Sequence, residues 1–325
     1  MKKRYFLLLI LGALGAAAFA LRTPDTDPQA MIAKYANAQS RFVENSEGLR
    51  VHYRDQGKPD GVPVVLAHGT AASLHTWAPL VERLGDKYRV ITYTQPGHGL
   101  TGPHPREDYS FAGMADALDL VAEELALESF VLGGNSMGGW IAWRYALANP
   151  EKIEALLLLD ASGAPAPTDS PYADWDDDDA PLAFRILSSP FGLFFVENYT
   201  PRAFLKSTSL QAVSVKSVMD EEAVDRYWQL LRYPGNRRAA ALLALSDREL
   251  AYADRLHEID QSTLIIWGAE DMFIPVDVAR TFDERIPDSD LVIYDGIGHI
   301  PMEEAPDRTA NDIDAFLKRA LGAAE

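Results

Sequence analysis

From residue 41 onward, short apolar runs alternate with longer stretches in which apolar positions recur at helical spacing. Short runs bounded by turn residues are typical of strands, and nearly continuous ones are typical of parallel strands buried on both faces. The runs predict strands at Arg41–Glu44, Arg50–Arg54, Pro63–Ala67, Arg89–Thr94, Ser129–Gly133, Ala155–Leu159, Thr263–Trp267 and Leu291–Tyr294. The periodic stretches predict helices at His75–Leu84, Met114–Leu125, Gly138–Ala148, Val276–Arg285 and Arg308–Ala320.

This order of elements predicts an α/β fold, in which a mostly parallel central sheet is flanked by helices. No helical pattern separates the first two predicted strands, so we expect an antiparallel edge on that sheet. The core is predicted to comprise residues 41–162 and 258–325.

The alternation stops between residues 163 and 257, which have many aromatic residues and no convincing strand. Helical patterns such as Asp220–Tyr233, with an acidic N-cap and Pro234-Gly235 at its end, predict a helical cap inserted between two strands. Within it, the acidic run Asp174–Asp179 is predicted to be a solvated loop, because a cation site needs oxygens that converge in space.

The N-terminus has the pattern of an export signal. Basic residues at positions 2–4 precede an uncharged run, Tyr5–Leu21, that contains Ala18-Phe19-Ala20. We predict that residues 1–21 are a signal peptide or a membrane anchor with the catalytic domain outside the cytoplasm, and that 22–40 are a linker. Cleavage near Ala20 would instead give a periplasmic or secreted protein.

Composition excludes several functions. With 30 Lys and Arg against 48 Asp and Glu the formal charge is −18, which disfavours nucleic acid as a partner. Cysteine is absent, so disulfides, thiolate metal sites and cysteine nucleophiles are excluded.

The seven histidines have no metal-ligand spacing, and no metal is expected. Gly97–Gly102 matches the dinucleotide fingerprint, but Pro103 and Pro105 prevent a helix from opening there, so no cofactor is expected.

A nucleophile motif lies between a predicted strand and a predicted helix. Gly134-Asn135-Ser136-Met137-Gly138 matches G-x-S-x-G. In a strand–turn–helix elbow the serine oxygen is exposed, and the glycines let neighbouring backbone pass close by. Ser136 is therefore the predicted nucleophile.

A base and an acid for this serine follow later in the chain. Asp271 comes after the predicted strand Thr263–Trp267, and His299 comes after the last strand. The order serine, acid, histidine is that of elbow-type hydrolases, and all three residues follow strands. Two rival acids remain open: Asp160 at the end of another strand, and Glu270 beside Asp271.

Two further groups complete the predicted site. The N–H groups of Thr70, in the His68-Gly69-Thr70 turn, and Met137 are predicted to form an oxyanion hole. Trp140, Phe195 and Trp228 are the predicted substrate-binding residues, in an apolar pocket facing the cap, with other aromatic candidates at Phe191, Phe194 and Tyr233.

Over residues 41–321 the sequence resembles the α/β-hydrolase fold superfamily. The resemblance rests on His68-Gly69, Pro96-Gly97-His98-Gly99, Gly134–Gly139, Asp271 and Gly298-His299. It implies a lid-capped hydrolase without cofactor, with Ser136 as nucleophile, His299 as base and Asp271 as the residue that orients the base. Where that family often has aspartate before its Pro-Gly-His-Gly turn, this sequence has Thr94.

Two branches of the superfamily are the most similar: capped carboxylesterases and, less closely, the meta-cleavage-product hydrolases, which cleave carbon–carbon bonds. The second branch usually has a Ser-Gly-Pro-Gly-like stretch after His-Gly, where this chain has Thr70-Ala71-Ala72-Ser73. It also often has arginine after the acid and tryptophan after the histidine, where Met272 and Ile300 stand here.

The sequence thus predicts a serine hydrolase that cleaves small to medium apolar carboxylic esters through an acyl-enzyme intermediate. The alternatives are a carbon–carbon bond hydrolase, an acyltransferase or a perhydrolase using the same triad, or a non-catalytic binding protein. The expected partners are a small-molecule ester and, through the N-terminal segment, a membrane. The sequence predicts no particular oligomeric state.

Overall fold

The computed structural model describes residues 22–170, 192–246 and 250–322, together with Leu182, Arg185 and Ser189. The predicted signal or anchor at 1–21, the acidic run Asp174–Asp179 and Phe191 lie outside the described residues. In the part of the chain that the structure describes, no helix is both long enough and apolar enough to cross a bilayer.

The described strands form one sheet of eight strands in the order β1-β2-β4-β3-β5-β6-β7-β8. Their bounds are β1 (Ser40–Glu44), β2 (Arg50–Gly57), β3 (Pro63–Ala67), β4 (Arg89–Tyr93), β5 (Phe130–Asn135), β6 (Ile153–Leu159), β7 (Thr263–Gly268) and β8 (Ser289–Tyr294). The β1–β2 and β2–β4 pairs are antiparallel and the others are parallel, which confirms the predicted fold class and edge.

Most strand bounds differ from prediction by one to three residues, and two of these differences have a physical cause. β8 begins at Ser289 rather than Leu291, because backbone pairing with β7 extends over polar, partly exposed residues that have no apolar pattern. β5 runs on to Asn135, so that Ser136 alone separates this strand from the following helix.

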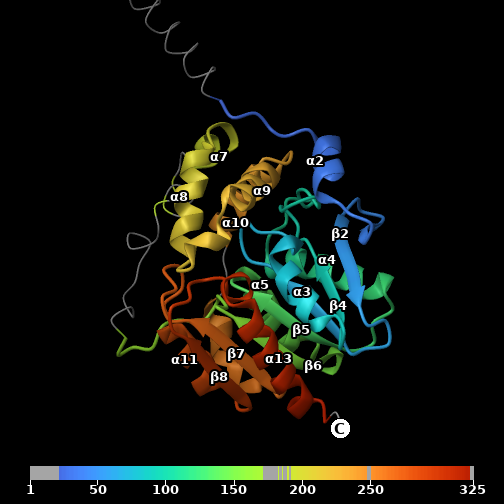
Figure 1. Ribbon diagram of the computed structural model, residues 1–325, viewed down its shortest axis with the longest axis vertical. Helices are drawn as coiled ribbons and strands as arrows, with labels where there is room; N and C mark the ends of the chain where they lie inside the picture. Colours follow the sequence, from blue (N-terminus) through green and yellow to red (C-terminus); the bar gives the residue numbers. More distant parts are fainter. Residues whose placement is uncertain are drawn as a thin grey trace, which may run out of the picture.

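Helices cover both faces of the sheet (Figure 1). One buried cluster packs α4 (Phe111–Glu124), α5 (Met137–Ala148) and α11 (Asp277–Arg285) on the sheet, and the other packs α3 (Ala78–Leu84) and α13 (Pro306–Ala320) on the opposite face. The predicted helix at 75–84 forms as a short 3₁₀ turn, η1 (Leu74–Trp77), followed by α3. Gly97–Gly102 forms a loop, and the next helix begins only at Phe111.

Between β6 and β7 the described residues form helices and no strand. They are α7 (Gly192–Asn198), α8 (Arg202–Ala212), η3 (Lys216–Val218), α9 (Glu221–Leu231), α10 (Asn236–Leu245) and η4 (Leu250–Glu258). Figure 1 shows α7 to α10 as one group set apart from the helices that flank the sheet. Asp220 caps α9 as expected, because its side chain accepts the Ala223 N–H at 2.8 Å.

The residues predicted as a linker are bound to this helical group. The Thr23 N–H donates to the Asn198 carbonyl at 2.8 Å, and the Thr26 N–H donates to the Arg232 carbonyl at 2.9 Å. Arg237 forms an ion pair with Asp25 at 2.7 Å. The chain then forms α2 (Pro28–Tyr35), and the remaining short elements are η2 (Pro150–Lys152) and α12 (Pro301–Glu304).

Candidate active site

Ser136 occupies a sharp turn between β5 and α5. Its backbone has φ 55° and ψ −119°, a conformation that L-residues rarely adopt. Close packing holds this turn: a Cβ on Gly134 would lie 2.1 Å from the Gly138 carbonyl oxygen, and one on Gly138 would lie 2.0 Å from that of Ala67. The motif glycines are therefore required by backbone contact, and they fix the serine at the positive end of α5.

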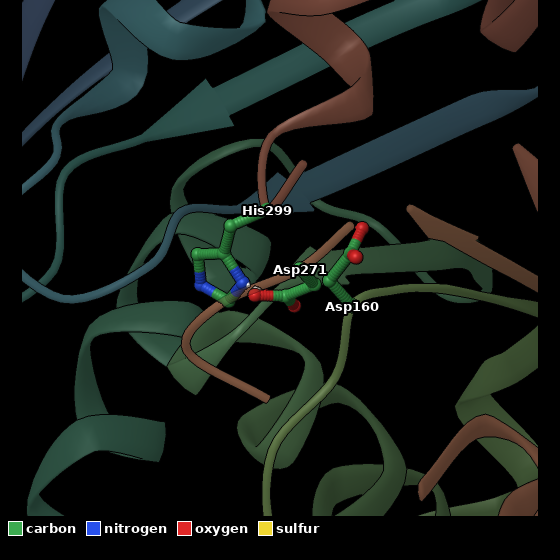
Figure 2. Close-up of side chains that lie close together, drawn as sticks. All are labelled: Asp160, Asp271 and His299. Carbon is green, nitrogen blue, oxygen red and sulfur yellow. Dashed lines mark hydrogen bonds and ion pairs between the residues drawn. The ribbon is translucent and has the colours of Figure 1, made fainter. Parts of the chain in front are cut away.

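The structure pairs His299 with Asp271 (Figure 2). The distance from His299 Nδ1 to Asp271 Oδ2 is 2.7 Å, and the Asp271 side chain is fully buried. The other oxygen, Oδ1, accepts the N–H groups of Phe273 at 2.7 Å and Ile274 at 3.1 Å. These two bonds orient the carboxylate, which leaves Oδ2 to accept from the imidazole.

The two rival acids have other partners. Glu270 is exposed and accepts the Gly296 N–H at 3.1 Å. Asp160 lies near Asp271, but its Oδ1 accepts the Gly268 N–H at 2.9 Å. Of the three candidates, Asp271 is the one hydrogen-bonded to His299.

Asp160, Asp271 and His299 each offer a ligand atom within 4.8 Å of the others, a spacing that also suits a metal ion. However, Nδ1 and Oδ2 are already joined by a hydrogen bond, and Asp271 Oδ1 holds two N–H groups. This geometry favours the orientation of an imidazole over metal coordination.

Side chains that the sequence did not mark hold the His299 loop. Asn135 donates from Nδ2 to the carbonyl of His299 at 2.9 Å, which ties the end of β5 to the His299 loop. The His299 N–H donates to the Ala212 carbonyl at 2.7 Å. Asn135 occupies the variable position of the nucleophile motif, so no sequence pattern singled it out.

Two neighbouring acids of α12 join the helical group to this loop. Glu304 accepts the N–H groups of Ser214 at 2.7 Å and Val215 at 2.8 Å with one oxygen, and that of Gly298 at 3.1 Å with the other. Glu303 accepts the hydroxyl of Tyr227 on α9 at 2.9 Å. Burial raises the pKa of Glu303.

The predicted oxyanion loop passes directly beside Ser136. A Cβ on Gly69 would lie 3.0 Å from Ser136 Cβ and 2.9 Å from Asn135 Oδ1. Thr70 lines the same cavity as Ser136, and Met137 is the first residue of α5, where backbone N–H groups have no partner within the helix. Thr70 and Met137, the two residues predicted for the oxyanion hole, thus lie close to each other and to Ser136.

His68 supports this loop in its neutral form. Its Nε2 accepts the Gln95 N–H at 3.0 Å, so the proton is on Nδ1, which donates to the Gly69 carbonyl at 2.8 Å. Complete burial lowers the pKa of His68 well below its usual value. Its function here is to shape the turn before Thr70.

Ser136 and His299 both line a cavity of about 680 Å³ between the sheet and the helical group. Its wall is mainly apolar, and the larger side chains from the helical group are Phe195, Val196, Tyr199, Phe204, Leu205, Met219, Tyr227 and Leu231. The described lining residues include no Lys, Arg, Asp or Glu. The cavity is suited to an uncharged group next to the serine.

Of the three predicted substrate-binding residues, Phe195 lines this cavity, whereas Trp140 and Trp228 do not. Trp140 is 1% exposed and packs edge-on against Phe111 in the core, because α5 is buried on all sides. Trp228 donates to the Thr200 carbonyl at 2.8 Å and is covered by Arg232. The structure thus places Trp140 in the core, and it places Trp228 against Thr200, a residue that lines the cavity.

A family model described as alpha/beta hydrolase fold matches residues 62–306 of this chain, which include every residue of the candidate site. The chain belongs to the α/β-hydrolase fold family. The resemblance found in the sequence is therefore confirmed, and this α/β hydrolase can be compared with known members.

Relatives of this α/β hydrolase have different named activities. A 2-hydroxy-6-oxononadienedioate/2-hydroxy-6-oxononatrienedioate hydrolase of Cupriavidus pinatubonensis is 30% identical over 80% of this chain and 89% of its own. Lipase 3 of a Moraxella species is 26% identical over 83% of this chain and 82% of its own. A solved structure, a thermophilic esterase of Thermogutta terrifontis, is 26% identical, has a TM-score of 0.68, and matches 87% of this chain and 99% of its own.

Proposed function

We propose that this α/β hydrolase is a serine esterase that cleaves carboxylic esters through an acyl-enzyme intermediate. The observation that carries the proposal is the position of Ser136 on a strained turn, in one cavity with a His299 that is hydrogen-bonded to Asp271. Ser136 attacks the ester carbonyl, His299 takes the serine proton and returns it to the leaving alcohol, and water then releases the acid. The N–H groups of Thr70 and Met137 hold the oxyanion.

The cavity favours an ester over the substrate named for the Cupriavidus relative. That name specifies a dicarboxylate. The described lining residues include no Lys or Arg, so a buried carboxylate there would lack a cation. Assays of an ester and a meta-cleavage product on the same preparation distinguish the two activities, and faster turnover of the second would reject our proposal.

Acyl transfer and perhydrolysis use the same first step, so only the acceptor of the acyl group distinguishes them from hydrolysis. A binding protein on this scaffold would need no reactive serine. Covalent labelling of Ser136 by a fluorophosphonate probe therefore supports an enzyme, and an unreactive Ser136 in folded protein contradicts it.

The cavity wall predicts a preference for short to medium acyl chains. Phe195 and its neighbour Phe194 are both about half exposed (51% and 58%), but of the two Phe195 lines the cavity and Phe194 does not. Phe195→Ala should enlarge the apolar site and move the acyl-length optimum toward longer chains, while Phe194→Ala on the same helix should leave it unchanged. The measurement is kcat/KM over esters from short to long acyl chains, together with both variants. A wild-type optimum at the longest chains, unmoved by Phe195→Ala, would show that this wall is not the size filter.

We further propose that the protein is exported and anchored by residues 1–21, with the catalytic domain outside the cytoplasm. The support is the basic and then uncharged pattern of that segment. Mass spectrometry of the native protein should find Met1 if the segment is an anchor, or Leu21 if it is removed as a signal. Recovery of the full-length chain in the soluble cytoplasm would contradict both.

A further inference from the structure

A second aspartate is buried beside the catalytic acid. Asp160 directly follows β6, its backbone has φ 43°, and it has no exposed surface. One carboxyl oxygen, Oδ1, accepts the Gly268 N–H at 2.9 Å. The other, Oδ2, has no hydrogen-bond partner among the residues that the structure describes. A buried polar atom without a partner needs an explanation, because its desolvation is costly.

The surroundings of Asp160 explain its protonation state. An oxygen of Asp160, an oxygen of Asp271 and a ring nitrogen of His299 lie within 4.8 Å of one another (Figure 2). The charged groups that act on Asp160 are Asp271, on the loop after β7, and Glu304, on α12, and both are acids. Burial, reinforced by the charge of Asp271, raises the pKa of Asp160 well above its usual value. A raised pKa favours the protonated form of Asp160 beside Asp271.

We propose that Asp160 is a neutral carboxylic acid that donates a hydrogen bond from Oδ2 to the Asp271 carboxylate, and so positions Asp271 for His299. The proposal rests on the triad of the proposed function. Asp160 does not touch the substrate and is a positioning residue. When Asp160 donates this hydrogen bond, Asp271 accepts from three donors besides the imidazole: the N–H groups of Phe273 and Ile274, and the Asp160 hydroxyl. The pair then carries a single negative charge opposite the imidazolium that forms during catalysis.

Two substitutions test whether Asp160 acts as a neutral hydrogen-bond donor or must carry a negative charge. In Asp160→Asn the amide oxygen can accept the Gly268 N–H and the amide N–H can donate to Asp271, so we expect kcat within about threefold of wild type. Asp160→Ala removes both bonds and should lower kcat roughly tenfold or more with KM nearly unchanged, because Asp271 is less well aimed. Glu270→Gln, at a neighbouring exposed acid, is the control and should have wild-type kcat.

The outcomes are decisive in both directions. If Asp160→Asn loses as much activity as Asp160→Ala, the charge of Asp160 is needed and the proposal is wrong. If Asp160→Ala keeps wild-type kcat, Asp160 positions nothing. If the proposed triad itself is wrong, a different experiment shows it: the Ser136→Ala variant would remain active.

Stability gives a second measurement, which is independent of catalysis and remains available if Asp160→Ala does not fold. An aspartate in the unfolded chain ionises above about pH 4, whereas Asp160 keeps its proton in the folded chain. Its contribution to stability is therefore complete below that pH and is lost progressively as the pH rises toward the folded-state pKa. Asparagine does not ionise, so the Asp160→Asn variant does not lose stability in this way as the pH rises. The Tm of Asp160→Asn minus that of wild type should thus increase from pH 5 to pH 8, and a constant difference would show that Asp160 is ionised and overturn the proposal.

Discussion

Ser136→Ala should lower the kcat for ester hydrolysis by roughly 10³-fold or more, because the hydroxyl that accepts the acyl group in the proposed mechanism is removed. Its Tm should stay close to that of wild type. Alanine has the same Cβ as serine, so the strained turn at φ 55° is unaltered and no core packing is lost. The measurement is single-turnover and steady-state hydrolysis of a chromogenic ester, with a thermal melt of the same preparation.

The matched control is Ser129→Ala. Ser129 is partly exposed and lies next to the opposite end of β5, where its hydroxyl donates to Glu154. The chemical change is identical, and kcat should be that of wild type. If Ser136→Ala kept more than a tenth of wild-type turnover, Ser136 could not be the nucleophile.

Asp271→Asn should reduce turnover by roughly 10²–10⁴-fold, a range taken from triads in other proteins. The carboxylate accepts a hydrogen bond from the Nδ1–H of His299, which leaves Nε2 free to take the serine proton. An amide can instead donate its N–H to Nδ1, which stabilises the tautomer protonated at Nε2, and that tautomer cannot act as the base. The kcat/KM values of Asp271→Asn, Asp160→Asn and Glu270→Gln should be compared on one ester.

In that comparison Asp271→Asn should have by far the lowest kcat/KM of the three variants. A larger loss in Asp160→Asn than in Asp271→Asn would assign the catalytic acid to Asp160. Equal, small losses in all three would mean that no carboxylate orients His299 during turnover.

The sequence predicted the elements and the order of the three triad residues because both depend on local patterns. Continuous apolar runs are recognisable as buried strands, and a residue that directly follows such a strand lies at its carboxyl end. Ser136, Asp271 and His299 all follow strands in this way, so they could be proposed together without knowing which strands are neighbours.

Contacts between distant segments could not be predicted in the same way. Asp160 meets Asp271 because β6 pairs with β7, and Glu304 meets Ser214 because the helical group rests on the His299 loop. Neither contact leaves a periodic signal in the sequence. The position of Trp140 in the core could not be predicted for a related reason: a helix that is apolar all round does not reveal which side faces the cavity and which faces the core.

The bonds made by Glu304 have a consequence for how this molecule opens. One carboxylate holds both the start of the Ser214–Val218 segment and the loop that precedes His299. N–H bonds to a buried carboxylate stabilise by about 1.5–3 kcal/mol each, so local unfolding at this junction breaks several strong bonds at once. Separation of the helical group from the His299 loop at this junction therefore requires all of these hydrogen bonds to break together.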